Sequence, residues 1–266
     1  MGKYRVSADI GGTFTDFVFY NTETGQYKAG KTLTTSENLS DAIINGISEE
    51  MHDFKDIHFF VHGTTSGLNA VLERKGANVA LITTKGFKDV YEIARGNRTA
   101  MYDMYYRKPI PLIKRQNIYE VEERILYDGT IKKQIEEDEI QKIAYDIKNK
   151  GFDSIAVCLI NAYNNPEHEV IIGEVLKDIL SDKPISLSHK IAREWREYER
   201  TSTVVLNSYI APIVENYLKF LEKRMKERGF DEMVYVMQSG GGVITAEIAK
   251  NAPIQSLLSG PVGGAI

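Results

Sequence analysis

The segment Asp9-Ile10-Gly11-Gly12-Thr13-Phe14-Thr15-Asp16 decides the fold of this 266-residue chain. It joins two apolar runs, 4–10 and 17–20, and a third run at 26–33 follows a turn cluster. Short apolar runs around a glycine turn are typical of a β-hairpin. We therefore predict consecutive N-terminal strands with the glycine loop as their first turn.

The loop itself has the composition of a phosphate-binding turn. Gly11 and Gly12 let the backbone approach a bulky anion closely, and successive N–H groups of such a turn form a concavity for phosphate oxygens. Thr13 and Thr15 add hydroxyl donors. Asp9 ends the first strand and is placed to hold Mg²⁺, which prefers oxygen ligands and keeps several waters. A bare Gly-Gly-Thr would fit a simple hairpin turn equally well, and the segment is neither a Walker A loop nor a dinucleotide fingerprint.

The rest of the chain alternates helix and strand patterns, which favours a layered α/β architecture. Helical spacing or capping signals predict helices over 38–50 (capped by Ser36 or Ser40), from 66 to 75, over 136–151, from Asn165-Pro166 onward, and over 194–228 with a break at Pro212. Apolar runs predict strands at 59–61, 78–83, 155–160, 185–187 and 233–237. The stretch 86–129 has no clean period, so it is expected to be functional or to contain structure without a sequence signal.

Composition narrows the class of protein. A net charge of -4 gives no electrostatic footprint for nucleic acid. No apolar stretch approaches the roughly 20 residues of a spanning helix, and no signal peptide is visible. The single cysteine, Cys158, lies in an apolar run and is predicted to be a buried small side chain. We expect a cytoplasmic protein with neither membrane nor nucleic-acid partners.

The octapeptide is similar to the first phosphate loop of the actin- and hexokinase-like ATPase superfamily. In this form it resembles the hydantoinase A/5-oxoprolinase (N-methylhydantoinase A-like) family. Further motifs follow in family order along the chain, at 62–65, 86–87, 95–98, 194–203, 238–242 and 259–264. The resemblance therefore covers essentially the whole sequence.

The resemblance implies a ribonuclease H-like (actin-like ATPase) α/β fold, with mixed-sheet layers and helices on the faces. It also implies ATP-dependent hydrolysis of a small cyclic amide such as a hydantoin or 5-oxoproline, with ATP and Mg²⁺ as cofactors. Phosphoryl transfer depends mainly on positioning and charge neutralisation. The expected catalytic residues are then Asp9, as the metal ligand, and Thr13, beside Gly11 and Gly12 on the phosphates. Thr15 is expected to bind the cofactor or, like Asp16, to support the loop.

Weaker candidates lie in the later motifs. Gly63 and Thr64 end a strand where a helix begins, and helix N-terminal amides suit anions. A plain helix cap at Thr64 or Thr65 is an equally good interpretation. His62 is a candidate for proton transfer, although an isolated histidine is more often structural.

Two further motifs complete the predicted cofactor and substrate contacts. Arg95 and Arg98 are candidates for bidentate binding of a carboxylate or phosphate, with ion-paired structural roles as the alternative. Gly240 and Gly241 are expected to approach the nucleotide or merely to turn the chain. The charged run 194–200 is predicted to be a helix face or an ion-pair network.

The predicted domains are 1–190, the family's N-terminal ATPase-like domain, and 191–266, the beginning of its hydantoinase A domain. The glycine-rich end suggests a longer parent protein, with a second Gly-Gly-Thr loop further on. The alternative functions are the ATP-binding subunit of an acetone- or acetophenone-type ketone carboxylase, a sugar or acid kinase, and a non-enzymatic ATP-driven reactivating chaperone. The expected assembly is a homo-oligomer or a complex with a hydantoinase B-type subunit.

Overall fold

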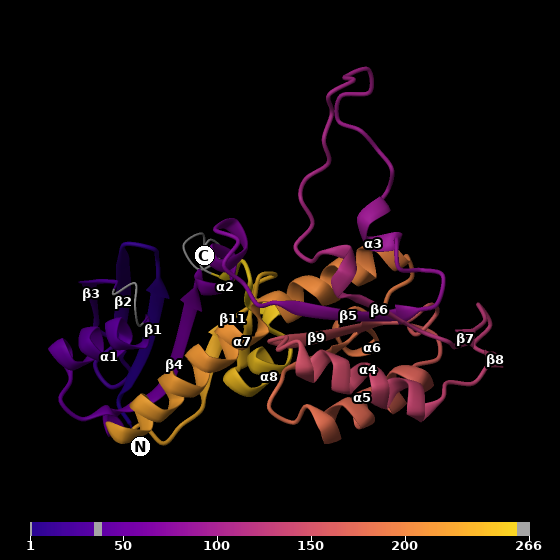
Figure 1. Ribbon diagram of the computed structural model, residues 1–266. Helices are drawn as coiled ribbons and strands as arrows, with labels where there is room; N and C mark the ends of the chain where they lie inside the picture. The colour runs from indigo at the N-terminus through magenta and orange to yellow at the C-terminus, as the bar shows by residue number, and fades with distance from the viewer. Residues whose placement is uncertain (1, 35–38, 260–266) are drawn as a thin grey trace. The chain divides into compact units, whose positions relative to one another are not determined.

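The computed structural model describes residues 2–34 and 39–259 (Figure 1). The predicted cap Ser36, the predicted helix start at residue 38 and the glycine-rich end from Gly260 onward lie outside these described residues. The chain forms two compact units. The first unit comprises Met1–Lys75 and Ile213–Ile266, and the second comprises Gly76–Pro212. The division at residue 190, drawn from the resemblance, stays a prediction about the family's domains.

The first unit contains a six-stranded mixed sheet in the order β12-β11-β4-β1-β2-β3. The strands are β1 (Tyr4–Ile10), β2 (Phe14–Asn21), β3 (Tyr27–Leu33), β4 (Ile57–Thr64), β11 (Val234–Met237) and β12 (Val243–Thr245). β1, β2 and β3 form an antiparallel meander, which confirms the predicted N-terminal strands. β4 pairs parallel with β1, and β11 pairs parallel with β4.

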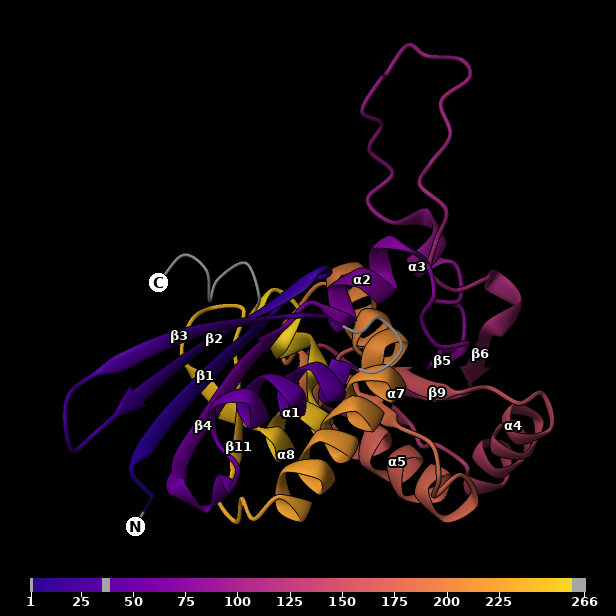
Figure 2. The ribbon, with the colours of Figure 1, turned by 90° about the vertical axis from the view of Figure 1, so that its left-hand side faces the viewer.

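Helix α1 (Leu39–Glu50) covers part of this sheet at close range. The strict alternation of β2 buries Phe17 and Phe19 on the face that α1 contacts. A Cβ atom on Gly46 would lie 2.3 Å from Cε2 of Phe17, so only glycine permits this approach. Figure 2 shows α1 beside the last turns of α7 (Glu197–Glu227), where Arg224 and Asp41 pair at 3.2 Å.

The further helical segments of the first unit are α2 (Ser66–Leu72), α8 (Ala246–Asn251) and the 3₁₀ turns η1 (Phe54–Asp56) and η3 (Pro253–Ser256). After Pro212, helix α7 buries one apolar face, made of Val214, Tyr217, Leu218, Leu221 and Met225, as expected for a core-facing helix. Helix α7 ends at Glu227, and Gly229 follows it with a φ of 93°, the left-handed conformation that commonly terminates helices.

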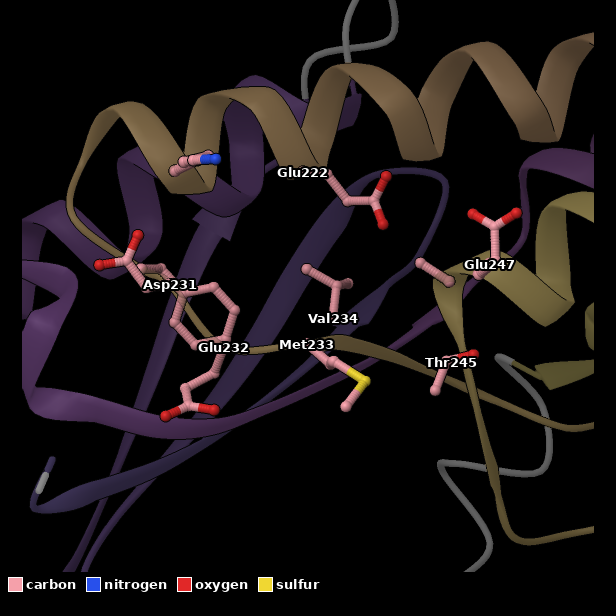
Figure 3. Close-up of a pocket in the computed structure, with 10 residues that line it drawn as sticks. Glu222, Asp231, Glu232, Met233, Val234, Thr245 and Glu247 are labelled. Carbon is pink, nitrogen blue, oxygen red and sulfur yellow. The ribbon is translucent and has the colours of Figure 1, made fainter.

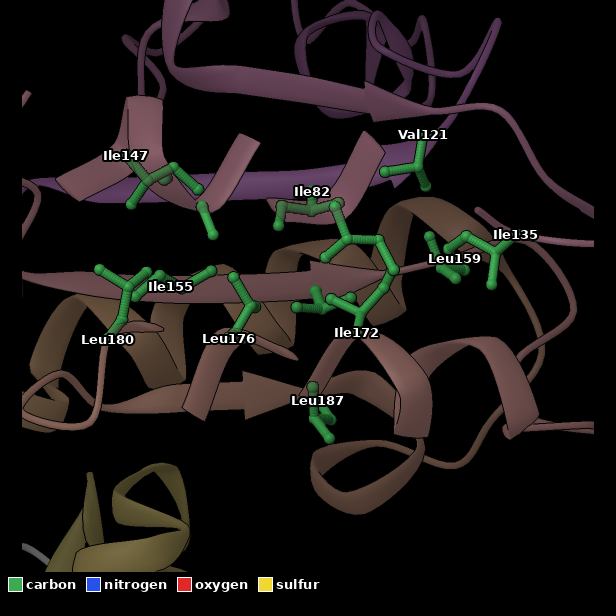
Figure 4. Packing of buried hydrophobic residues seen from close by; sticks show 14 of the residues in the cluster. Ile82, Val121, Ile135, Ile147, Ile155, Leu159, Ile172, Leu176, Leu180 and Leu187 are labelled. Carbon is green, nitrogen blue, oxygen red and sulfur yellow. The ribbon is translucent and has the colours of Figure 1, made fainter. Parts of the chain in front are cut away.

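The second unit is built on a parallel four-stranded sheet in the order β10-β9-β5-β6. Its strands are β5 (Val79–Thr84), β6 (Ile118–Val121), β9 (Ser154–Cys158) and β10 (Ile185–Leu187). Helices α4 (Glu137–Asn149), predicted from its periodicity, and α5 (Glu167–Ile179), predicted from Asn165-Pro166, pack against it. Figure 4 shows Ile147, Ile172 and Leu176 of these helices packed against Ile82 and Ile155 of the strands.

Short elements fill the region that had no sequence period. They are α3 (Val90–Ile93), η2 (Arg115–Asn117), β6, and the hairpin of β7 (Arg124–Ile125) with β8 (Ile131–Lys133). Between α3 and η2 the chain forms a long excursion, conspicuous in Figure 1. This segment, residues 94–114, is called the arm below.

The predicted break at Pro212 is wrong, because α7 continues through this residue. A proline inside a helix removes one N–H donor and leaves the carbonyl four residues earlier without its partner. That carbonyl belongs to Ser208, and it accepts a hydrogen bond of 2.7 Å from the Ser154 hydroxyl. The side chain of Ser154 therefore replaces the missing backbone bond. Pro166 was expected to be the first residue of a helix, but it is the N-cap residue of α5, which begins at Glu167.

Candidate functional site

Three parallel strands of the first unit end at one edge of the sheet, and each is followed by a predicted site segment. In the register of β1 and β4, Asp9 lies beside Gly63 and Ile10 beside Thr64. β11 runs parallel to β4 and leads into the loop 238–242. Ligands of α/β sheets typically bind outside the carboxyl ends of the strands. The edge formed by β1, β4 and β11 is called the nucleotide edge below, after the ligand that the sequence predicts there.

The glycine loop between β1 and β2 packs closely against its own backbone at Gly11 and leaves open space beside Gly12. The Gly11 amide donates to the Phe14 carbonyl at 3.0 Å. A Cβ on Gly11 would lie 2.9 Å from that carbonyl oxygen, so the turn requires glycine there. A Cβ on Gly12 would meet no atom within 4 Å, and Gly12 and Thr13 are exposed. The loop therefore leaves accessible space over its backbone, as a phosphate cradle needs.

Thr34 secures this loop from below. Its hydroxyl donates to the Gly11 carbonyl at 3.0 Å, and its amide donates to the Thr13 carbonyl at 2.9 Å. The hydroxyls of Thr15 and Thr34 lie 3.0 Å apart, and Thr15 is fully buried. Thr15 is thus placed to support the loop, and its direct contact with a cofactor stays a prediction. Thr34 carried no motif signal in the sequence.

Asp9 has a carboxylate oxygen without a partner. Its Oδ1 is buried and makes no hydrogen bond within residues 2–34 and 39–259. Burial, and secondly the negative charge of Asp16, raise the pKa of Asp9 above its usual value. Asp16 lies opposite on β2 and pairs with Lys31 at 3.0 Å. A buried polar atom without a partner calls for an explanation, and a hard cation with oxygen ligands fits this one.

No cluster of three or more histidine, cysteine, aspartate or glutamate side chains with metal-ligand geometry occurs in the described part of the chain. A metal ion at the nucleotide edge would therefore take Asp9 together with water and ligand oxygens. That is the coordination expected of Mg²⁺ bound with a nucleotide.

The end of β4 is tied both to the glycine loop and to Ser259. The Thr65 hydroxyl donates to the Ile10 carbonyl at 3.2 Å. The Thr64 amide donates to the Ser259 hydroxyl at 3.2 Å, and this hydroxyl donates to the Thr64 carbonyl at 3.1 Å. Thr65 occupies the N-cap position of α2 but makes no capping bond with its side chain. The Thr64 hydroxyl instead accepts from the Ser66 amide at 3.2 Å, so Thr64 binds the first turn of the helix.

His62 is buried in the core of the first unit. Its Nδ1 lies 3.3 Å from the Tyr217 hydroxyl, and the Tyr217 ring meets it edge-on at 5.6 Å. Phe60 stacks on its other side at 5.8 Å. Burial lowers the pKa of His62 to about 4, so the ring is neutral at neutral pH. These contacts favour the structural interpretation over proton transfer.

The loop after β11 is a glycine hairpin with open space above it. The Gln238 amide donates to the Gly242 carbonyl at 3.0 Å, and the Gly241 amide donates to the Gln238 carbonyl at 3.2 Å. Gly241 and Gly242 have φ of 87° and 82°, which L side chains rarely adopt. A Cβ on Gly240 or Gly241 would meet nothing within 4 Å. Turn geometry thus accounts for Gly241, while Gly240 has no steric requirement from the loop.

Arg95 and Arg98 belong to the second unit. Arg95 pairs with Glu199 at 2.6 Å, which is the structural role given as the alternative. Arg98 stacks on the ring of Tyr106, with its guanidinium carbon 5.4 Å from the ring centre. The two arginines therefore differ in how many of their donors are occupied.

The charged run 194–200 forms ion pairs, as predicted. Arg200 is fully buried and donates to the Ser188 hydroxyl at 2.7 Å and to the Leu159 carbonyl at 2.6 Å. The buried carboxylate of Glu169 accepts from the same Ser188 hydroxyl at 2.5 Å and from the Leu159 amide at 3.0 Å. Ser188 and Leu159 thus bridge a buried cation and a buried anion.

A cavity of about 310 Å³ in the first unit lies away from the nucleotide edge. Figure 3 shows it beside Met233 and Val234, at the start of β11, whereas the glycine hairpin follows the end of that strand. Two of its carboxylates, Glu222 and Glu247, pair with Lys250 at 3.0 Å and 2.8 Å. Cys158, in the second unit, is buried, which confirms the prediction of a buried small side chain, and burial raises its pKa to about 11. Nowhere in the described ranges is there a helix long and apolar enough to cross a bilayer.

The chain is similar to known proteins along essentially its whole length. A family model described as the hydantoinase/oxoprolinase N-terminal region matches residues 5–180, and a second, described as hydantoinase/oxoprolinase, matches 200–266. An uncharacterized protein of Methanocaldococcus jannaschii is 43% identical over 99% of the chain and 39% of its own length. The acetophenone carboxylase gamma subunit of Aromatoleum aromaticum is 29% identical over 97% of the chain and 38% of its length. The 5-oxoprolinase of Dictyostelium discoideum is 31% identical over 98% of the chain and 23% of its length.

Two solved structures share the fold. The ATP-dependent caprolactamase of Pseudomonas jessenii superposes with a TM-score of 0.87 at 28% identity, over 97% of this chain and 39% of that one. A nucleotide-free acetone carboxylase, described as ATP-dependent, superposes with a TM-score of 0.86 at 26% identity, over 100% of this chain and 40% of that one. The chain therefore has the predicted actin-like ATPase fold and spans about two fifths or less of the length of these relatives. It belongs to the hydantoinase/oxoprolinase family.

Proposed function

We propose that this chain is the ATP-binding part of an ATP-dependent cyclic-amide hydrolase that opens a hydantoin or 5-oxoproline ring. The observation that carries the proposal is the nucleotide edge. There the parallel strands β1, β4 and β11 each end in a glycine-containing segment, and Gly12 and Gly240 leave open space above the backbone. The 5-oxoprolinase and caprolactamase relatives support the reaction class.

The roles of the residues follow from their positions. The exposed loop from Gly11 to Thr13 would bind phosphate oxygens through its amides and the Thr13 hydroxyl, with Thr34 keeping the loop rigid. Asp9 would hold Mg²⁺ through the buried oxygen that has no other partner. ATP supplies the phosphoryl group that makes the unreactive amide carbonyl of the ring susceptible to water. The part of this chain is to bind and orient the phosphates and to neutralise their charge.

Nucleotide binding to the 266-residue chain tests the proposal, with isothermal titration of ATP in Mg²⁺ as the measurement. The Asp9→Asn variant keeps the size of the side chain but removes the anion that a cation needs. We expect it to weaken binding at least about tenfold, as for a lost charge-assisted contact. Glu23→Gln, at an exposed turn carboxylate, is the matched control and should bind within about twofold of wild type.

Two outcomes would contradict this assignment. If the wild-type chain is folded by circular dichroism but binds no nucleotide, the proposed function is contradicted. If the Asp9→Asn variant binds ATP as tightly as wild type and with the same Mg²⁺ dependence, Asp9 is not the metal ligand. In the longer protein, Asp9→Ala should then also abolish ATP turnover.

A second candidate function is the ATP-binding subunit of a ketone carboxylase. It is favoured by the acetone carboxylase structure, whose match extends over the whole chain. The two functions separate in a substrate panel with the longer protein. Bicarbonate-dependent consumption of acetone or acetophenone would indicate the carboxylase, and ring opening of cyclic amides without bicarbonate would indicate the hydrolase. Because one relative is a gamma subunit, we also propose that the protein acts in a complex with a second kind of subunit.

A further inference from the structure

The tip of the arm exposes a cluster of large apolar and aromatic side chains. Tyr102, Met104 and Tyr105 are 94%, 93% and 90% exposed, and Met101 is 69% exposed. A cluster of this kind on a protein surface commonly marks an interaction site. Tyrosine is enriched among the residues that dominate binding energy at interfaces, and methionine adapts to irregular surfaces. The tip therefore has the composition of an interface.

The tip is also held in a defined turn, which is centred on Asp103. The Asp103 amide donates to the Ala100 carbonyl at 3.3 Å, and the Tyr106 amide donates to the Asp103 carbonyl at 3.3 Å. The Asp103 carboxylate accepts from the Tyr105 amide at 2.9 Å. Arg98, on the opposite limb of the arm, stacks on Tyr106 with its guanidinium carbon 5.4 Å from the ring centre. A tip that is already ordered loses less conformational entropy on binding than a free loop does.

The arm is basic, whereas the chain as a whole is acidic. Residues 94–114 contain five arginine and lysine side chains and a single aspartate, so the arm carries a net charge of +4. Because the whole chain carries -4, the remainder carries -8. Arg107 is exposed and forms no ion pair with any residue that the structure describes. The arm is therefore complementary in charge to the remaining surface of another copy of the same chain.

The cavity of about 310 Å³ beside Met233 offers an apolar surface for such a tip. Phe230 and Val234 are buried beneath it, and Met233 is 62% exposed beside it. The start of β11 and the beginning of α8 supply its walls, together with the last turns of α7. An open, apolar hollow of this volume can accept a tyrosine or methionine side chain.

Negative charge surrounds this apolar surface. Four carboxylates line the cavity against one lysine, Lys226. Glu222 and Glu247 share Lys250 as their partner. Asp231 and Glu232 are exposed, and neither forms an ion pair within the described ranges. Figure 3 shows these two carboxylates together at one side of the cavity, where they are accessible to a basic partner.

We propose that the tip of the arm docks into the Met233 cavity of a second copy of the chain. The tyrosine and methionine side chains of the tip cover Met233, and Arg98 and Arg107 face Asp231 and Glu232. The contact joins two different surfaces, so a reciprocal exchange closes a dimer in which each copy gives an arm and receives one. The inference is independent of nucleotide binding.

Sedimentation equilibrium of the 266-residue chain across the micromolar range tests the proposal. Wild type should associate to a dimer. An arm variant, Tyr102→Ser with Tyr105→Ser, should weaken the association at least about tenfold, as expected for the loss of two interface tyrosines. A cavity variant, Asp231→Lys with Glu232→Lys, should weaken it to a similar degree, because like charges then meet.

A mixture of the two variants identifies which surfaces touch. The arm variant keeps an intact cavity, and the cavity variant keeps an intact arm. An equimolar mixture should therefore form a dimer again, although each variant alone stays monomeric. Contacts between two tips or between two cavities would not be restored in this way.

Control variants separate the contact from general effects of polarity and charge. Tyr127→Ser replaces a tyrosine that is 82% exposed outside the arm and should leave the association unchanged. Glu174→Lys with Asp178→Lys makes the same charge change at exposed positions of α5 and should also leave it unchanged. Circular dichroism establishes that each variant is folded.

Three results would overturn the proposal. The first is a wild-type chain that remains monomeric at every concentration. The second is an arm or cavity variant that associates as wild type does, or a control variant that loses the association to the same degree. The third is a mixture of the arm and cavity variants that stays monomeric.

Discussion

Acid should destabilise the first unit through His62. Burial lowers the pKa of this histidine from 6.5 to about 4, whereas in the unfolded chain it returns to its ordinary value. Between these two values the unfolded state binds more protons than the folded state, so the free energy of unfolding rises with pH. The stabilisation is complete above about pH 6.5 and is lost as the pH falls toward about 4. A difference of about 2.5 units, at about 1.4 kcal/mol per unit, amounts to roughly 3 kcal/mol.

The assay is urea denaturation followed by circular dichroism at several pH values, for wild type and His62→Phe. Phenylalanine keeps the aromatic contact with Phe60 but leaves the Tyr217 hydroxyl without its partner, which costs about 1 kcal/mol at every pH. The informative quantity is therefore the difference in pH dependence, because other titrating groups act equally in both proteins. That difference should approach 3 kcal/mol between pH 7 and pH 4. Parallel curves, or an NMR titration of His62 near 6.5, would refute the reasoning and reopen a role in proton transfer.

Three further changes test packing, charge and turn geometry. Gly46→Ala should destabilise the fold by about 1–3 kcal/mol in thermal melts, although alanine favours helix, because its Cβ would overlap the Phe17 ring; exposed Asn45→Ala should not. Arg200→Leu should cost about 3–5 kcal/mol in urea denaturation, because it removes the buried cation that Ser188 links to the Glu169 carboxylate and leaves the Leu159 carbonyl without its charged donor; the double change with Glu169→Leu should be milder than the sum of the two single changes. Gly241→Ala should cost about 1–2 kcal/mol in the same assay because of its left-handed φ, with stability unchanged in Gly240→Ala.

Local signals in the sequence were sufficient for the elements around the glycine loop. The alternation in 4–10 and the turn at 11–13 specify a hairpin whatever lies around it, and β1 and β2 follow this pattern. Helix α4 was equally predictable from its apolar spacing, which reflects one buried face, and the start of α5 was predictable from Asn165-Pro166. Asp9 and the loop could therefore be placed at the end of a strand before any tertiary contact was known.

Features that depend on distant parts of the chain had no such signal. Thr34 and Ser259 fasten the nucleotide edge, yet each is a single hydroxyl whose partner is known only from the fold. Pro212 gave the opposite signal, because the bond that rescues its helix comes from Ser154, 58 residues away. β12 and α8 are too short for a clear period. The local sequence pattern thus predicts helices and strands, whereas only the tertiary structure shows which side-chain hydroxyl donates to which backbone carbonyl.

The contrast between satisfied and unsatisfied polar groups supports the assignment of the nucleotide edge more directly than its glycines do. Beneath the loop, the Gly11 and Thr13 carbonyls are bonded to Thr34. At the end of the same strand, Asp9 keeps a buried oxygen without a partner and a pKa raised by burial and by Asp16. A hydrogen-bond donor beside this oxygen would stabilise a purely structural carboxylate. Leaving the buried oxygen without a donor therefore carries an energetic penalty in the free protein. A cation arriving with the phosphates would remove that penalty and lower the pKa of Asp9. Binding of ATP with Mg²⁺ should therefore release protons near the raised pKa of Asp9, whereas binding to Asp9→Asn should not.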